Sequence, residues 1–356
     1  MLEQIQKGFD VPLIHDPDQV QSLYAQAARQ RICLANFCTS NPYTTESILR
    51  SALEFAQAHN VTPAPMIVSA TGRYPTEPQL EAYTSTGNAS LGMRALEDDV
   101  RSLVAPGSPF EAVPVLLHLD HGQPGLDDDL FEQAIGTYAT VMYDASGWGM
   151  DDNIRLTRDF LARVGGRVLV EGAVAEVAQA SDHAELPLTT PEAAQDFLEQ
   201  TGVFLIVPDL GTEHRAAGGA VAQYDGALAR AMTARVGAKI VLHGSSSLQE
   251  SDLPQLASDG IAKVNVWTIF ERIGAQAVAR FALRELGGIL EEAELHDLER
   301  DGWIGKAHFT GGRAIGPTLE FLRESARRDV WQAAVEARMK HYLEHFGYAR
   351  WTGRDT

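Results

Sequence analysis

Cysteine is scarce in this sequence, and long apolar runs are missing from it. The 356 residues include two cysteines, Cys33 and Cys38. If residues 31–39 form a strand, these two side chains point to opposite faces and cannot easily form a disulfide. Free thiols suit a reducing compartment. No run approaches the roughly 20 apolar residues of a membrane span, and no apolar signal segment begins the chain. We therefore expect a cytoplasmic protein that does not enter a membrane.

The sequence also contains few basic residues relative to acidic ones. Lysine and arginine number 29 against 48 acidic residues, which gives a net charge of −19. Nucleic acid is not an expected partner, because binding its phosphates requires a basic surface. A small anionic substrate needs only a local positive site, such as a metal ion or a helix N-terminus. The acidic surface is itself explained by solubility, and the 45% of apolar residues allow a large buried core.

Eight short apolar runs recur along the chain, separated by amphipathic stretches of helical period. They lie at residues 31–39, 64–70, 113–121, 138–146, 167–174, 203–211, 239–247 and 261–268. Nearly continuous apolar strands that alternate with helices are typical of a parallel sheet covered by helices. Eight repeats favour closure, and no G-x-G-x-x-G motif follows the first run. We predict an α/β fold, the (β/α)₈ TIM barrel, with extra C-terminal helices.

Three stretches between the runs have clear helical patterns, at residues 44–59, 151–164 and 247–259. The expected N-caps of the first two are Thr44 or Thr45, and Asp151 or Asp152. Residues 75–92 are expected to form a long loop at the active-site end. We expect one TIM-barrel domain over residues 1–356, with its core at about 30–285 and a helical extension at about 286–356.

Polar side chains collect where the predicted strands end, and the strand ends of a barrel build its active site. The strongest set is His118, Asp120, His121, Asp144, Ser146, Glu171, Asp209, His214, His243, Ser245, Ser246, Asn265 and Thr268. Burying one such group without a partner costs about 2 kcal/mol or more, so a ring of them indicates a functional site.

Three of these histidines, His121, His214 and His243, follow separate strands. Imidazoles that converge from separate strands suit a catalytic zinc ion. Any single histidine is also explained by an ordinary hydrogen-bonded position, which we expect for His118. Asp120 directly precedes His121, and two roles stay open for it. It could move a proton at a hydroxyl that the metal orients, or it could hold a ligand histidine in place.

The segment HGSSS (243–247) follows the seventh run. A small residue followed by hydroxyls and backbone N–H groups suits a phosphate, and barrels often bind phosphate after strands seven and eight. The alternative is a helix N-cap at Ser246 or Ser247. Together with NVWT (265–268) in the eighth run, the segment favours a phosphate site.

Several segments resemble motifs of the class II fructose- and tagatose-bisphosphate aldolases: PVLLHLDHG, LIVPDLGTEHR, IVLHGSSSL and GIAKVNVWT. The likeness covers most of residues 30–285. It implies a zinc-dependent aldehyde-lyase of carbohydrate metabolism, related to glycolysis, that cleaves a phosphorylated ketose reversibly to dihydroxyacetone phosphate and an aldehyde. It also implies a homodimer or homotetramer.

The resemblance also assigns roles to residues. His121, His214 and His243 would bind Zn²⁺, and Asp120 would exchange the proton of the substrate's C4 hydroxyl. The zinc would polarise the C2 carbonyl and stabilise the enediolate left when the C3–C4 bond breaks. The phosphorylated three-carbon half of the substrate would be held by Ser69, Gly244, Ser246, Asn265 and Thr268.

Two further carboxylates, Asp144 and Glu171, are candidates to accept hydrogen bonds from the metal-binding histidines without binding the metal themselves. Glu171 matches the first acid of the family's Glu-x-Glu signature, but Ala173 stands where the second is usual. AQASDHAEL (178–186) replaces the glycine-rich loop that, in the family, helps to bind a monovalent cation and supplies a second acid. A monovalent cation therefore stays only an option for this chain.

Other positions also depart from the family pattern. Trp267 and Ile269 replace acidic residues, Cys38 replaces an asparagine, and RAAGG (215–219) lacks an expected lysine. The altered positions lie around the substrate, while the metal set is complete. We therefore expect a substrate other than fructose 1,6-bisphosphate.

Two alternatives remain open at this point. The same metal and enediolate chemistry could epimerise a sugar or sugar acid by cleavage and re-addition. Alternatively, the segments CTSNP (38–42) and YTSTG (83–87) resemble the non-catalytic partner subunit of tagatose-bisphosphate aldolases. The complete set of three histidines and Asp120 argues against that second reading, because a subunit without activity has no need of a metal pocket.

Overall fold

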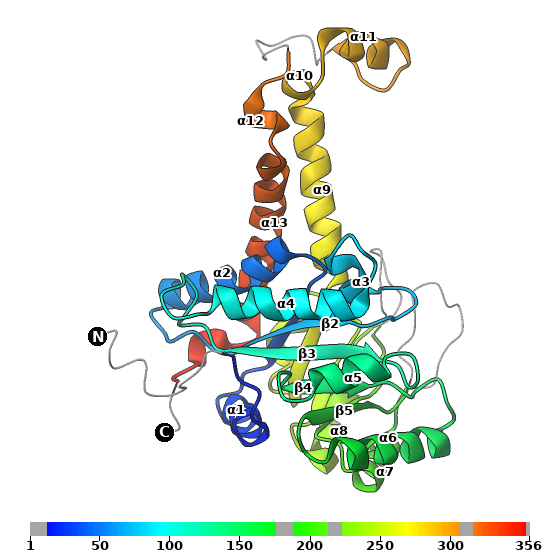
Figure 1. Cartoon of the computed structure of the whole chain (residues 1–356). Coiled ribbons are helices and arrows are strands. Elements are labelled where there is room, and N and C mark those ends of the chain that lie inside the picture. The colour runs from blue at the N-terminus through cyan, green and yellow to red at the C-terminus, as the bar shows by residue number, and fades with distance from the viewer. Residues whose placement is uncertain (1–12, 176–187, 213–222, 307–315, 354–356) are drawn as a thin grey trace. The chain divides into compact units, whose positions relative to one another are not determined.

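Eight parallel strands close into a barrel in the computed structural model, which describes residues 13–175, 188–212, 223–306 and 316–353 (Figure 1). Each strand pairs with the next, and β8 pairs with β1. The strands are β1 (Leu34–Cys38), β2 (Met66–Thr71), β3 (Val115–Gly122), β4 (Thr140–Tyr143), β5 (Leu169–Ala173), β6 (Leu205–Val207), β7 (Ile240–Leu242) and β8 (Ile261–Val266). Each predicted run supplies one strand, so the predicted TIM barrel is confirmed.

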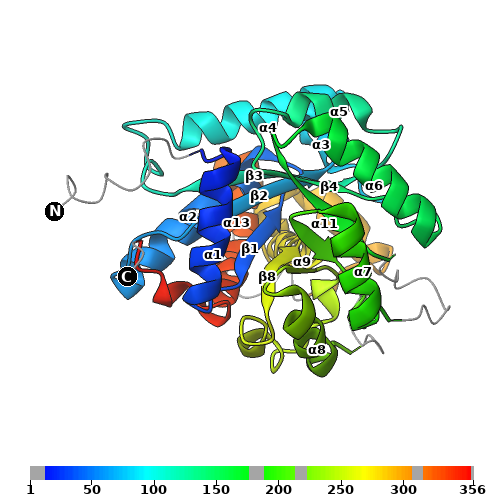
Figure 2. The same ribbon diagram turned by 90° about the horizontal axis from the view of Figure 1, so that it is seen from below.

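Helices surround the barrel (Figure 2). They are α2 (Pro42–His59), α3 (Gln79–Tyr83), α4 (Ala89–Leu103), α5 (Asp128–Ala134), α6 (Met150–Val164), α7 (Pro191–Thr201) and α8 (Gly226–Val236). Each long helix buries one apolar face, as α6 does with Ile154, Phe160 and Val164. In the described part of the chain, none of the helices combines the length and apolar character that crossing a bilayer requires.

The amino ends of the strands are covered by α1 (Pro17–Arg29) (Figure 2). Tyr24 packs edge-on against Phe204, just before β6, with ring centroids 5.1 Å apart. A backbone bridge joins Leu13 to Val115 at the start of β3. Because α1 covers this end, the carboxyl ends of the strands, where the predicted site residues lie, form the accessible mouth of the barrel.

The start of α2 differs from the prediction. Asn41, not Thr44 or Thr45, is its N-cap, and the Asn41 Oδ1 accepts a hydrogen bond from the Thr44 backbone N–H at 2.8 Å. Pro42 explains the shift, because proline is favoured at the first helical position and sets φ for the helix.

Three other local predictions are also corrected. Gly149 precedes α6, so Asp151 and Asp152 lie in its first turn, where their charges favour the helix N-terminus. Residues 247–259 form no α-helix: they begin at the last residue of the 3₁₀ turn η2 (Ser245–Ser247) and contain the 3₁₀ turn η3 (Leu253–Gln255). Pro254 lacks the N–H that a longer helix needs. The expected loop at 75–92 contains all of α3 and the first residues of α4.

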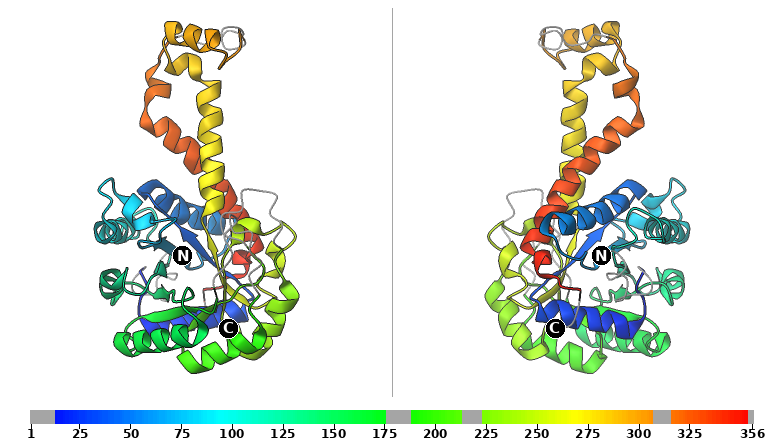
Figure 3. Two further views of the ribbon diagram at one scale, coloured as in Figure 1. Left: turned by 90° about the vertical axis from the view of Figure 1, so that its right-hand side faces the viewer. Right: turned by 90° about the vertical axis from the view of Figure 1, so that its left-hand side faces the viewer.

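Residues Ile269–Arg338 form a second, helical unit, whereas Met339–Thr356 belong with the barrel. The elements here are α9 (Thr268–Arg284), α10 (Leu286–Ile289), α11 (Glu292–Arg300), α12 (Leu319–Leu322) and most of α13 (Glu324–His345). Within the unit, Gly274 brings α9 close to α13, since a Cβ there would lie 2.5 Å from the Trp331 ring (Figure 3). The single domain with a core at about 30–285 and an extension at about 286–356 stays a prediction.

Glycine also sets the packing of α3 against α4 inside the barrel unit. A Cβ at Gly92 in α4 would lie 1.8 Å from the carbonyl oxygen of Leu80 in α3. Only a residue without a side chain lets the two backbones approach this closely. The close packing of α3 against α4 therefore depends on Gly92.

We predict that Gly92→Ala lowers the free energy of unfolding by about 1–3 kcal/mol, because the added methyl group must push the two helices apart. Urea denaturation followed by circular dichroism measures the change. Gly305→Ala is the matched control, because no atom lies within 4 Å of a Cβ at that position. Equal stability of the two variants would contradict the close approach of α3 and α4.

Candidate active site

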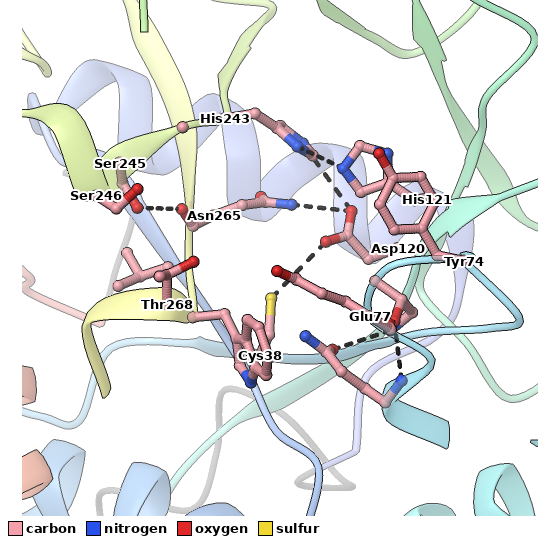
Figure 4. A pocket seen from close by; sticks show the side chains of 15 residues that line it. Cys38, Tyr74, Glu77, Asp120, His121, His243, Ser245, Ser246, Asn265 and Thr268 are labelled. Atoms are coloured by element: carbon pink, nitrogen blue, oxygen red, sulfur yellow. Dashed lines mark hydrogen bonds and ion pairs between the residues drawn. The ribbon is translucent and has the colours of Figure 1, made fainter. Parts of the chain in front are cut away.

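Most of the predicted site residues meet at the carboxyl ends of the strands. Asp120 and His121 lie at the end of β3, His243 follows β7, and Asn265 lies in β8. They line one pocket at the mouth of the barrel (Figure 4). The other predicted residues in its wall are Gly244, Ser245, Ser246 and Thr268.

Two imidazoles converge in this pocket. Nδ1 of His243 lies 3.0 Å from Nε2 of His121, and the two rings are nearly perpendicular at 89°. A carboxylate oxygen of Asp120 lies close to both, so that the three ligand atoms are all within 4.8 Å of one another. The three side chains are buried and come from two strands that are not neighbours in the barrel.

The backbone at His121 has an unusual conformation. Its φ is +46°, and the pairing of β3 with β4 shifts register between Leu119 and Gly122. A residue with a Cβ loses about 1 kcal/mol or more in this left-handed region. Such an irregularity turns a side chain away from the alternation of a regular strand. It places Asp120 and His121 in the wall of the same pocket, although they are adjacent in sequence.

The ring of His121 is held from two sides. Its Nδ1 lies 2.8 Å from Oδ2 of Asp144, and Asp144 in turn accepts a hydrogen bond from the Ser146 hydroxyl at 2.6 Å. Tyr74 stacks on the other side, with ring centroids 4.6 Å apart. These contacts present Nε2 to the pocket. Asp144 thus makes the orienting contact that metal-binding histidines commonly have.

The donor set fits a zinc ion. Zinc–nitrogen bonds of 2.0–2.1 Å place two tetrahedral ligand nitrogens about 3.3 Å apart, close to the observed 3.0 Å between His121 and His243. Two imidazoles and a carboxylate are also ligand types that zinc prefers. The third predicted ligand, His214, lies outside the described residues.

Asp120 is held at the side of the pocket. Its Oδ1 accepts a hydrogen bond from Nδ2 of Asn265 at 3.0 Å, and the thiol of Cys38 lies 3.7 Å from its Oδ2. Burial alone would raise the pKa of Asp120. The neighbouring His121, together with His118 and His243, outweighs burial and holds this pKa well below its usual range. Asp120 is therefore ionised, the form that can accept a proton.

Burial lowers the pKa of His121, but nearby carboxylates have the opposite effect. Asp120, then Asp144 and finally Glu77 raise it, and the result is a pKa above the ordinary value. The imidazole therefore keeps a proton at a higher pH than a free histidine.

A buried ion pair lies at the inner side of the site. Nζ of Lys263 lies 2.6 and 2.8 Å from the two oxygens of Glu171, and 3.2 Å from Nε2 of His118. Nδ1 of His118 lies 2.7 Å from the Thr140 hydroxyl. His118 thus has the ordinary hydrogen-bonded role expected for it. The described contacts of Glu171 are with Lys263 and His118, which differs from the expected support of His121 or His243.

The residues predicted to bind phosphate line the same pocket, except Ser69. Gly244 has φ +68°, and the Ser245 hydroxyl donates to the Asn265 carbonyl oxygen at 2.6 Å, which links the turn after β7 to β8. Ser69, in contrast, is fully buried behind the wall and donates its hydroxyl hydrogen to Sγ of Cys38 at 3.1 Å. Cys38, which lines the pocket, separates Ser69 from it.

The segment between β2 and α3 adds residues that carried no role in the sequence analysis. Tyr74, Glu77 and Gln79 line the pocket together with Thr71, the last residue of β2. Their sequence signal was weak, because they lie in an irregular stretch without a periodic pattern. Lys263 had a stronger signal, since a lysine inside an apolar strand is rarely buried without an acidic partner.

Comparison with known proteins agrees with this geometry. The family model described as "Fructose-bisphosphate aldolase class-II" matches residues 18–349. The fructose-bisphosphate aldolase of Streptococcus pyogenes is 27% identical over 327 residues, which are 88% of this chain and 97% of that protein. The uncharacterised protein YdjI of Escherichia coli is 27% identical over 239 residues, 63% of this chain and 83% of that protein.

A solved structure has the same fold. The crystal structure of fructose-bisphosphate aldolase from Campylobacter jejuni superposes with a TM-score of 0.68 at 17% identity, and covers 94% of this chain and 95% of that one. The family match spans nearly the whole chain and agrees with the barrel and the polar pocket at its mouth. This chain belongs to the class II fructose-bisphosphate aldolase family and is an enzyme of the aldolase type, a lyase.

Proposed function

We propose that this enzyme is a zinc-dependent aldolase that reversibly cleaves a phosphorylated ketose, other than fructose 1,6-bisphosphate, to dihydroxyacetone phosphate and an aldehyde. The observation that supports this proposal best is the convergence of Asp120, His121 and His243, whose ligand atoms lie within 4.8 Å of one another. A subunit without activity would have no need of two converging imidazoles beside an ionised carboxylate.

His121 and His243 would hold the zinc ion, with His214 as the proposed third ligand. When bound, zinc supplies a Lewis acid that polarises the C2 carbonyl and offsets the negative charge that develops on its oxygen. The contact with Asp144 keeps His121 in the orientation that this role needs.

Asp120 is the proposed base for the C4 hydroxyl. Its carboxylate accepts that proton as the C3–C4 bond breaks and the C4 carbonyl forms. Asn265 holds Asp120 in place through Nδ2. Its Oδ1 is buried and has no hydrogen-bond partner among the described residues. An amide oxygen is an acceptor, so it suits a substrate hydroxyl better than a phosphate oxygen.

Gly244, Ser246 and Thr268 are proposed to bind the phosphate of the three-carbon half. The opposite part of the substrate meets a different wall, to which Trp267 and Cys38 contribute. Among the described residues that line the pocket, none is a lysine or arginine. Trp267 and Cys38 in this wall support a substrate whose second half differs from that of fructose 1,6-bisphosphate.

The direct test of the proposal combines metal analysis with isotope exchange. We expect about one tightly bound zinc ion per chain, and incorporation of deuterium at C3 of dihydroxyacetone phosphate in deuterated water. Zinc without exchange would overturn aldol chemistry on this phosphate. Exchange without formation of new ketoses from any aldehyde would favour another enediolate reaction over an aldolase.

We predict that zinc affinity falls as the pH falls. The raised pKa of His121 means that zinc must displace a proton, so apparent affinity should drop about tenfold per pH unit below that pKa. Competition with a chromophoric chelator between about pH 7.5 and 5.5 measures this dependence.

We also predict that His243→Ala loses the zinc. His296→Ala, which changes an exposed histidine of α11, should keep it. Unchanged zinc content in His243→Ala would show that His243 is not a ligand.

We further predict that Asp120→Asn keeps its zinc and its fold but lowers the cleavage rate by about two to four orders of magnitude, as expected when a general base is lost. Steady-state assay with the identified ketose and circular dichroism measure the two properties. Asp152→Asn on the exposed start of α6 is the matched control. Full activity of Asp120→Asn would reduce Asp120 to a structural neighbour of the metal ligands.

A further inference from the structure

A second carboxylate reaches the pocket from the segment between β2 and α3. Glu77 belongs to the same pocket wall as Asp120, Cys38 and His121. Figure 4 shows its side chain extending into the cavity toward Cys38 and Asp120. It is also near enough to His121 to raise the pKa of that imidazole when the Glu77 carboxyl group is ionised. The proposed reaction, as described so far, gives this carboxylate no role.

The position of Glu77 is fixed by the backbone around it. The Thr71 N–H donates to Oε1 of Gln79 at 3.0 Å, and the Gln79 N–H donates to the Thr71 hydroxyl at 3.1 Å. The Thr71 hydroxyl in turn donates to the carbonyl oxygen of Glu77. These bonds close the segment into a compact turn around Glu77.

The other end of the segment is anchored as well. The guanidinium group of Arg73 binds both carboxylate oxygens of Asp129, at 2.6 and 2.7 Å, and its backbone N–H donates to Asp127 at 3.0 Å. Tyr74 stacks on His121. A side chain held on an anchored segment can act on a substrate with little cost of ordering.

Aldol cleavage needs two proton transfers at different atoms. One removes the proton of the C4 hydroxyl, and the other adds a proton to C3 after the C3–C4 bond has broken. A single carboxylate that has just accepted the first proton lies beside the departing aldehyde. A second titratable group on another wall would allow the two transfers to occur independently.

Among the described residues, three other positions near the site are poorly suited to this second transfer. Burial above all, and the charge of Asp120 next, raise the pKa of the Cys38 thiol well above its usual range. Glu171 is paired with Lys263 and is not part of the described pocket wall. Ala173, at the end of β5, has no group that could carry a proton.

We propose that Glu77 is a second catalytic residue, which transfers the proton at C3 of the three-carbon product. This inference rests on the proposed aldolase function. In the cleavage direction, the C3–C4 bond breaks, its electron pair stays with the three-carbon fragment as the enediolate, and Asp120 takes the C4 hydroxyl proton. The carboxylic acid of Glu77 then gives its proton to C3, which forms the C3–H bond of dihydroxyacetone phosphate and leaves the Glu77 carboxylate.

Both groups return to their starting forms by exchange with water, when Asp120 loses its proton and Glu77 gains one. In the condensation direction, the Glu77 carboxylate removes the C3 proton of dihydroxyacetone phosphate. The enediolate then attacks the aldehyde, and protonated Asp120 supplies the hydrogen of the new hydroxyl.

The test compares two reactions of the zinc-loaded protein. The first is deuterium exchange at C3 of dihydroxyacetone phosphate, followed by proton NMR. The second is interception of the enediolate, formed from the cleaved ketose, by the oxidant hexacyanoferrate(III). For Glu77→Gln we expect exchange to fall by about two to four orders of magnitude, while interception continues. For Asp120→Asn we expect the opposite result: interception should fall, because cleavage needs the C4 hydroxyl proton removed, while exchange at C3 continues.

Matched variants separate chemistry from structure. Glu81→Gln changes the same residue type on α3, outside the pocket wall, and should leave both reactions unchanged. Glu77→Asp keeps a carboxylate and should retain more exchange than Glu77→Gln. Exchange in Glu77→Gln within about threefold of the original protein, or an equal loss in Glu81→Gln, would overturn the role of Glu77. Absence of exchange in the unchanged protein would instead overturn the proposed function.

Discussion

The site depends on the contact between Nε2 of His121 and Nδ1 of His243, which are 3.0 Å apart. At this distance only one cation, either a shared proton or a metal ion, can bind to both ring nitrogens. His121 reaches this position only because its backbone adopts a left-handed conformation beside the irregular pairing of β3 with β4. The strain is local, and the closed barrel around it holds the conformation in place.

Charged side chains surround the contact between His121 and His243. Asp120 and Asp144 lie beside His121, and the pair of Lys263 with Glu171 lies on the inner side of Asp120. A buried ion pair adds little stability by itself, because the loss of water offsets much of the attraction. Here the ion pair serves to hold neighbouring side chains in position. It fills the barrel interior with polar groups that satisfy one another and also reach His118.

The barrel could be predicted from the sequence because the strands are largely apolar and helical stretches lie between several of the runs. The polar ends of these runs also predicted Asp120, His121, His243 and Asn265, which do meet in one pocket. The position of Ser69 behind Cys38 could not be predicted, because the pattern fixes which strand carries a residue but not which neighbour covers it. Helix starts were missed by a few residues where Pro42 or Gly149 determined the boundary.

Tyr74 and Glu77 lie in a segment whose path depends on contacts distant in sequence, such as that of Arg73 with Asp129, and no periodicity predicts such contacts. This separation has an evolutionary consequence. The histidines and Asp120 belong to β3 and the end of β7, whereas the β2–α3 segment is a separate piece of chain anchored by its own bonds. Substitutions in this segment, other than at Tyr74 and Glu77, could alter which substrates are accepted while the ion-binding strands stay unchanged.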